Sequence, residues 1–179
     1  MKTARQFATQ TYLPLGLGLI TVQTLGFYIL NERLFASMWG LLSWLAVLIL
    51  AIVGIQQFKK SNQGFVTFKE AFTIYFFTIL GYVLGLFLII ELLYLIDGGL
   101  MNRVQEYTLD AQVSMMEWFS GKELEPKDIG QLKKVHAEDW DKVREPKFMA
   151  LGPATYMAMF SVIGLIVAAV TKKNRPEFQ

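Results

Sequence analysis

The chain has no cysteine, a single histidine and almost no charge within its long apolar stretches. Without cysteine there is no disulfide framework, no cysteine-ligated zinc and no thiolate nucleophile. A lone histidine, His136, cannot supply the paired imidazoles of a typical zinc enzyme. The acids that follow it, Glu138, Asp139 and Asp141, fall at mixed helical phases and indicate a solvated acidic face. We therefore expect no metal site, no cofactor and no catalytic residues.

Hydrophobic residues make up 54% of the 179-residue chain and gather in long runs. A run of about 20 residues is long enough to cross a hydrocarbon core of roughly 30 Å as a helix. A soluble domain of this composition would expose large apolar patches. The runs lie near residues 12–30, 36–55, 71–96 and 150–170. The sequence predicts an all-α fold, a four-helix transmembrane bundle that forms a single membrane domain over residues 1–179.

Basic residues are distributed unevenly between the two ends of the predicted spans. Lys and Arg in short loops mark the cytoplasmic side, and the loop between the first two runs carries only Arg33. We expect a multi-pass membrane protein with both termini in the cytoplasm, and helical rather than barrel-type spans indicate the inner (cytoplasmic) membrane. Attraction to lipid explains the lysines beside the span ends, so the bilayer is the expected partner and nucleic acid is not. The basic residues assigned to the cytoplasmic side are Lys2, Arg5, Lys59, Lys60, Lys69, Lys172, Lys173 and Arg175.

The polar segment 97–149 is predicted to be an extracytoplasmic helical loop. Apolar residues recur at steps of three or four from Leu100 to Trp118, and Ser120-Gly121 supplies a stop signal. A second helix is expected to begin at Pro126 and to end at Glu145-Pro146. This outer segment either packs on itself as a cap over the bundle or binds an envelope protein. The two faces comprise Leu100, Val104, Tyr107, Ala111, Met115 and Trp118, and then Ile129, Leu132, His136, Trp140 and Val143.

The stretch before the third run has a recognisable pattern, Gly64-Phe65-Val66-Thr67-Phe68-Lys69-Glu70-Ala71-Phe72. Thr67 and Glu70 have the spacing of a capping box. This stretch, the span that ends at 94–97, the acidic helical loop and the final span that closes in Lys172-Lys173 resemble the bacterial domain-of-unknown-function family 4199. The resemblance covers nearly the whole chain. It implies small membrane proteins with four predicted spans and no assigned activity, so it transfers no catalytic or binding residue.

One charge lies inside an apolar run, Glu91 in the third span. A charge at the bilayer centre costs about 2.5 to 3.5 kcal/mol on insertion scales, so such residues often mark pathways or relays. Glu91 precedes Asp97 by roughly 9 Å of helix, which also fits a carboxylate near the interface. Gln23 in the first span should lie at a similar depth. We therefore predict Glu91 and Gln23 as a candidate intramembrane polar pair.

Small residues mark the candidate helix-packing surfaces. Gly81 and Gly85 form a G-x-x-x-G motif in the third span, a spacing that lets helix backbones approach closely. Packing within the chain is the expected use, and a homo-oligomer is the alternative. Gly152-Pro153 is expected to mark the outer start of the fourth helix. The corresponding small residues of the fourth span are Ala154, Ala158, Gly164 and Ala168.

Three functional classes are compatible with these features. The leading expectation is a non-enzymatic membrane protein with an envelope-interaction, scaffold or regulatory role through its outer helical loop. The alternative is a small proton-coupled transporter that acts as a homo-oligomer with Glu91 as the intramembrane carboxylate. An enzyme ranks third, because no acid–base residues converge by spacing.

Overall fold

The computed structural model describes residues 3–30, 39–143 and 145–174. All regular structure in these ranges is helical, and they contain no β-strand, so the all-α prediction is confirmed. The elements are α1 (Ala4–Phe7), the π-helix η1 (Ala8–Tyr12), α2 (Leu13–Leu30), α4 (Trp39–Ser61), α5 (Phe68–Ile96), α6 (Leu100–Ser120), α7 (Pro126–Val143) and α8 (Pro146–Thr171).

Three helices in the described part are long and apolar enough to cross a membrane. The spans are Leu42–Ser61 in α4, Phe68–Ile96 in α5 and Leu151–Thr171 in α8. They indicate a membrane protein, as the sequence predicted. The first predicted span, 12–30, covers the last residue of η1 and the whole of α2, which is not one of these three. The start of the second predicted span and Arg33 lie outside the described residues.

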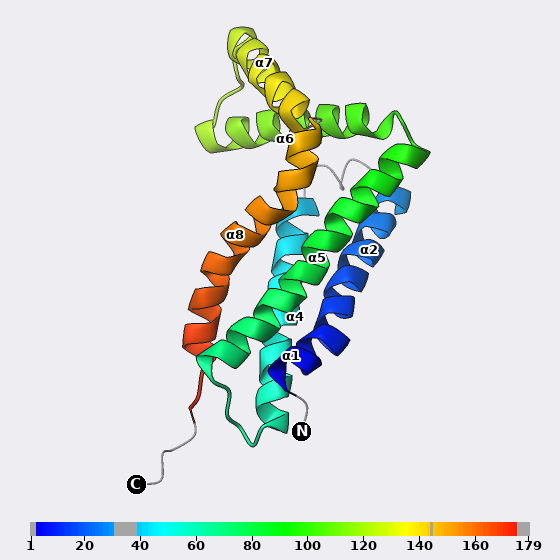
Figure 1. The fold of residues 1–179 in the computed structure, drawn as a ribbon. Coiled ribbons are helices and arrows are strands. Elements are labelled where there is room, and N and C mark those ends of the chain that lie inside the picture. The colour runs from blue at the N-terminus through cyan, green and yellow to red at the C-terminus, as the bar shows by residue number, and fades with distance from the viewer. Residues whose placement is uncertain (1–2, 31–38, 144, 175–179) are drawn as a thin grey trace.

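α5 is the central helix of the structure. It packs against α2, α4 and α8, and Figure 1 shows it passing diagonally among them. α2 and α5 run in the same direction, whereas α4 and α8 return (Figure 1). The start of α1 and the end of α8 therefore lie at one end of the long helices, and α6 and α7 lie at the other.

Local signals explain where several helices begin. At the start of α5 the Glu70 carboxylate accepts a hydrogen bond from Thr67 N at 2.8 Å, while Thr67 Oγ1 accepts one from Glu70 N at 3.3 Å. This is the predicted capping box, which satisfies backbone donors that lack helical partners. The π-helix η1 ends just before Pro14. Proline has no backbone N–H to donate within a helix, and its ring crowds the preceding helical turn. Both effects favour a local widening of the helix into a π-helix.

The start of α8 differs from the sequence prediction. α8 begins at Pro146, with Glu145 as its N-cap, and Pro153 lies inside the helix rather than at its outer start. Proline fits the first helical turn because the N–H that it lacks has no helical acceptor there. A second proline is tolerated further along an apolar helix when neighbouring helices support the interrupted turn.

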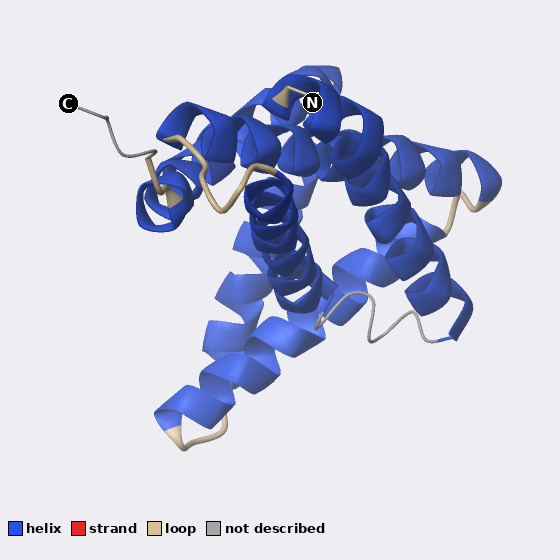
Figure 2. Ribbon diagram, turned by 90° about the horizontal axis from the view of Figure 1, so that it is seen from below, coloured by secondary structure: helices blue, strands red, loops and turns tan. Residues whose placement is uncertain are grey.

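Within the polar segment, α6 and α7 form a helical hairpin. α6 lies crosswise over one end of the long helices and α7 returns over it (Figure 1). Gly121 ends α6 with φ of 67°, a left-handed conformation that glycine adopts without steric cost. Viewed from below, the turn between α6 and α7 projects sideways beyond the long helices (Figure 2).

Candidate functional site

The structure does not bring the predicted polar pair together. The Glu91 side chain is exposed on the same surface of α5 as the exposed Leu84, Leu88 and Leu95. Gln23 on α2 is partly buried, and its Oε1 has no hydrogen-bond partner. No hydrogen bond joins Gln23 to Glu91, because the rotation of α5 turns the carboxylate away from the contact with α2.

The glycines of α5 pack within the chain. Gly81 and Gly85 are buried against α2. A Cβ on Gly81 would overlap the carbonyl oxygen of Leu13, and a Cβ on Gly85 would lie 2.5 Å from Ile20 Cγ2. This approach brings two backbones together where lipid offers no hydrophobic drive for association.

The small residues of α8 divide into two groups. Gly164 and Ala168 are buried, and a Cβ on Gly164 would lie 2.5 Å from the ring of Tyr75. Ala154 and Ala158, nearer the start of the helix, are exposed. The predicted packing surface of α8 is therefore buried in its second half, where Gly164 approaches Tyr75 of α5.

A carboxylate fixes the corner where α5 ends and α6 begins. Asp97 Oδ2 accepts hydrogen bonds from Tyr28 Oη at 2.9 Å and from Arg103 Nη2 at 2.5 Å. Gly99 N donates to the other carboxylate oxygen at 3.1 Å. Asp97 thus joins the end of α2, the end of α5 and the first turns of α6.

The contacts of Asp97 also determine its charge. Hydrogen bonds from Arg103 and then Tyr28 stabilise the ionised form and lower the pKa of Asp97 from 3.8 to about 2. The opposing effect of partial burial is smaller. The corner is therefore held by an ionised carboxylate throughout the physiological pH range.

The histidine lies in the contact between α6 and α7. His136 is 7% exposed, and its Nε2 lies 2.9 Å from the carbonyl oxygen of Gln105 and 3.2 Å from Thr108 Oγ1. A carbonyl oxygen only accepts hydrogen bonds, so the Nε2 atom of His136 carries the ring proton and donates a hydrogen bond to the carbonyl oxygen of Gln105. The ring lies beside Trp140, at 6.1 Å between centroids, and Trp140 in turn packs against the core. His136 is a structural residue of the hairpin.

The acids after His136 do not form a metal site. Glu138, Asp139 and Asp141 are exposed, and Asp139 pairs with Lys142 at 2.9 Å. In the ranges that the structure describes, no group of three or more His, Asp or Glu side chains is placed to hold a metal ion.

A groove separates α6 and α7 beyond His136. It has a volume of about 300 Å³ and is lined by both apolar and polar side chains, with one charged residue from each helix. The groove combines apolar and polar side chains outside the three candidate spans, as a binding surface requires. The lining residues are Leu109, Asp110, Val113, Ser114, Ile129 and Lys133.

Neither the Asp97 corner nor this groove was predicted from the sequence. Tyr28 and Asp97 are 69 residues apart, so no local pattern indicates their contact. The groove is lined by residues of α6 that lie off its predicted apolar stripe. The stripe therefore did not indicate these residues.

The comparisons with known proteins give the family. A family model described as "Protein of unknown function (DUF4199)" matches residues 13–173, which include every long helix and the hairpin. Neither the curated proteins nor the solved structures contain a match to the chain. The chain therefore belongs to the DUF4199 family of proteins of unknown function.

Proposed function

We propose that this chain is a non-enzymatic membrane protein that presents its α6–α7 hairpin to an envelope protein. The observation that carries the proposal is the groove between α6 and α7, which lies outside the three candidate spans. Apolar side chains of both helices line it, and Asp110 and Lys133 add opposite charges to the lining. Such a surface suits an amphipathic helix or an extended segment of a partner protein.

The arrangement of the helices supports a membrane location and an orientation. We propose that α2 is the fourth span, since α1, η1 and α2 follow one another without a break and α2 exposes Leu15, Val22 and Ile29. The described basic residues Arg5 and Lys59 lie at the end opposite the hairpin. Positive charge marks the cytoplasmic side. We therefore propose that both termini lie in the cytoplasm of a bacterial cell and that the hairpin lies on the outer face of the inner membrane.

Cysteine crosslinking in intact cells tests the groove. The chain has no cysteine, so each introduced thiol is unique. Lys133→Cys places the thiol in the groove, and Lys134→Cys, one residue along, places it on another face of α7. We expect a crosslinked envelope protein from position 133 and none from position 134. Equal capture at both positions, or capture at neither, would contradict the proposal.

A proton-coupled transporter is a second candidate function. The observation that favours it is the exposure of Glu91 among Leu84, Leu88 and Leu95 on α5. A carboxylate that faces lipid is unfavourable, so a second copy of the chain that covered this surface would relieve the cost. In such a homo-oligomer two Glu91 side chains would lie near the subunit contact and exchange protons.

Flux through purified protein in vesicles distinguishes this candidate. Glu91→Gln keeps the shape of the side chain and removes its proton exchange, so transport coupled to a proton gradient should be lost. The matched change Leu88→Gln introduces the same amide one turn earlier and should leave flux intact. Unchanged flux in Glu91→Gln would rule out the transporter.

A further inference from the structure

The end of α6 carries a cluster of exposed apolar side chains, here called the tip patch: Met115, Met116, Trp118 and Phe119. Trp118 is 77% exposed and Phe119 is 74% exposed. Their rings meet edge to face with centroids 4.8 Å apart, so the aromatic surface is continuous. Clusters of large apolar side chains at a surface indicate contact with another apolar phase.

Met115 and Trp118 of the tip patch continue the face of α6 that packs onto the long helices. Leu100, at the start of α6, is 2% exposed and belongs to the core. About five turns of 3.6 residues separate Leu100 from Trp118, so the two side chains leave the helix in the same direction. Trp118 lies about 27 Å further along the helix. At that distance the face no longer lies over the long helices.

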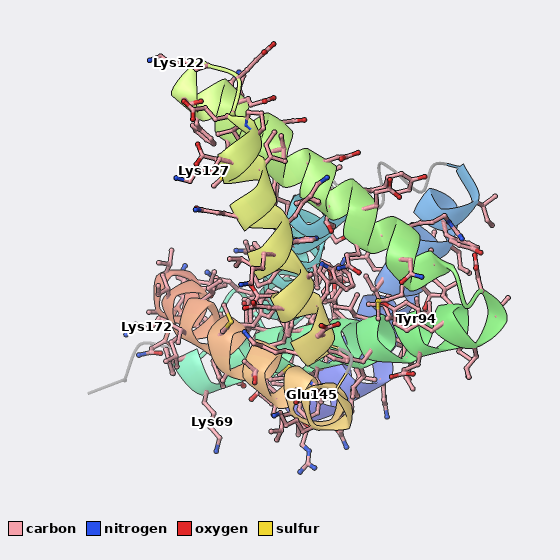
Figure 3. The ribbon with its side chains drawn as sticks, turned by 90° about the horizontal axis from the view of Figure 1, so that it is seen from above. Lys69, Tyr94, Lys122, Lys127, Glu145 and Lys172 are labelled. Carbon is pink, nitrogen blue, oxygen red and sulfur yellow. The ribbon has the colours of Figure 1, made fainter. Side chains whose placement is uncertain are left out.

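The orientation of α6 shows what lies beneath this face. α6 runs crosswise to the long helices (Figure 1), and the view from above shows Lys122, just after the end of α6, far from the labelled Lys172 and Lys69 (Figure 3). A helix crosswise to membrane-spanning helices lies along the membrane plane. Past the edge of the long helices, the inward side of α6 therefore faces lipid.

The end of α5 gives the level of α6 relative to the bilayer. Leu95 and Ile96 are 81% and 78% exposed, so the lipid-facing surface of α5 extends to its last residue. Asp97 follows with a lowered pKa, and α6 begins at Leu100. α6 therefore starts where hydrocarbon gives way to headgroups, which is the region that Trp side chains favour.

We propose that the tip patch inserts into the headgroup region of the lipid leaflet at the hairpin end of the molecule and anchors the hairpin there. Trp118 and Phe119 supply apolar surface, and the indole N–H of Trp118 remains near polar headgroups. The neighbouring Lys122 and Lys127 are offset by Glu123, Glu125 and Asp128. Attachment therefore depends on apolar insertion and does not require anionic lipid.

Depth measurements with nitroxide labels test the anchor. Met115→Cys is labelled in the full chain in phosphatidylcholine vesicles, which keeps Trp118 and Phe119 in place. Gln131→Cys, exposed on α7, is the matched control. The ratio of collisions with oxygen to collisions with a water-soluble nickel chelate should be severalfold higher at position 115. Replacing Trp118 and Phe119 together by serine should abolish this difference.

Two results would overturn the proposal. Equal access of the nickel chelate to positions 115 and 131 would show that the tip patch lies in water. Dipolar broadening between labels at position 115 would show instead that a second copy of the chain covers the patch. Neither result depends on the groove between α6 and α7, because Lys133, the crosslinking position in that groove, lies outside the tip patch. The anchor and the envelope partner are therefore tested separately.

Discussion

Tyr28 Oη donates a hydrogen bond to Asp97 Oδ2 over 2.9 Å and joins the end of α2 to the end of α5. Arg103, from the first turns of α6, donates to the same oxygen. One carboxylate therefore holds three helices at the corner from which the hairpin departs. Leu100 and Val104 are the residues of α6 that belong to the buried core among those described, so this charged contact and a short apolar contact together hold α6 at the corner.

The contribution of Asp97 to stability should depend on pH. Its pKa is lowered from 3.8 to about 2, so its stabilisation is present above 3.8 and is lost as the pH falls through about 2. The free energy of unfolding in detergent micelles should therefore be higher for the native chain than for Asp97→Asn at pH 7. The difference should shrink below about pH 4. A difference that stays constant down to pH 2 would contradict the assignment.

Substitution of Gly81 should separate α2 from α5. In Gly81→Val the new side chain would overlap the carbonyl oxygen of Leu13, and overpacking of this kind costs about 1–3 kcal/mol. Unfolding in a detergent titration measures the change. Gly26→Ala is the control, since a Cβ there meets no atom within 4 Å. If both variants unfold alike, the close approach of α2 and α5 is not what stabilises the fold.

Loss of the His136 side chain should open the hairpin. His136→Ala removes the Nε2 donor to Gln105 and leaves a cavity between α6 and α7. Disruption of a buried polar contact costs about 1–3 kcal/mol, so amide hydrogen exchange in α7 should accelerate while exchange in α5 is unchanged. Val135→Ala, at an exposed neighbouring position, should have little effect. Faster exchange in α5 as well would mean that His136 supports the whole fold.

Lys59 should stabilise the end of α8. Its Nζ donates to the carbonyl oxygen of Thr171 at 3.2 Å, at the negative end of the helix dipole. Lys59→Gln should cost about 0.3–1 kcal/mol and increase proteolysis after α8. Lys60→Gln removes the same charge from an exposed neighbouring residue and should leave both the stability and the proteolysis after α8 unchanged. Identical proteolysis of the two variants would assign the effect to net charge alone.

The sequence by itself determined the helices. Run length and hydropathy located three apolar spans, and local signals located the starts and ends, such as the Thr67 capping box and the stop at Gly121. These features depend on residues within a few positions of one another, so their physics is contained in a short segment of chain. Pro153 was misplaced because proline is also tolerated inside an apolar helix.

Only the tertiary structure decided which side chains meet. The sequence placed Gln23 and Glu91 at similar depth, but contact depends on how each helix is rotated about its axis, and α5 turns Glu91 outward. The bond between Tyr28 and Asp97 likewise requires two helices to end at the same level. The rotation of each helix about its axis and its position along the axis follow from the combined packing of glycines and aromatic rings along α2, α5 and α8. No short pattern in the sequence contains that information.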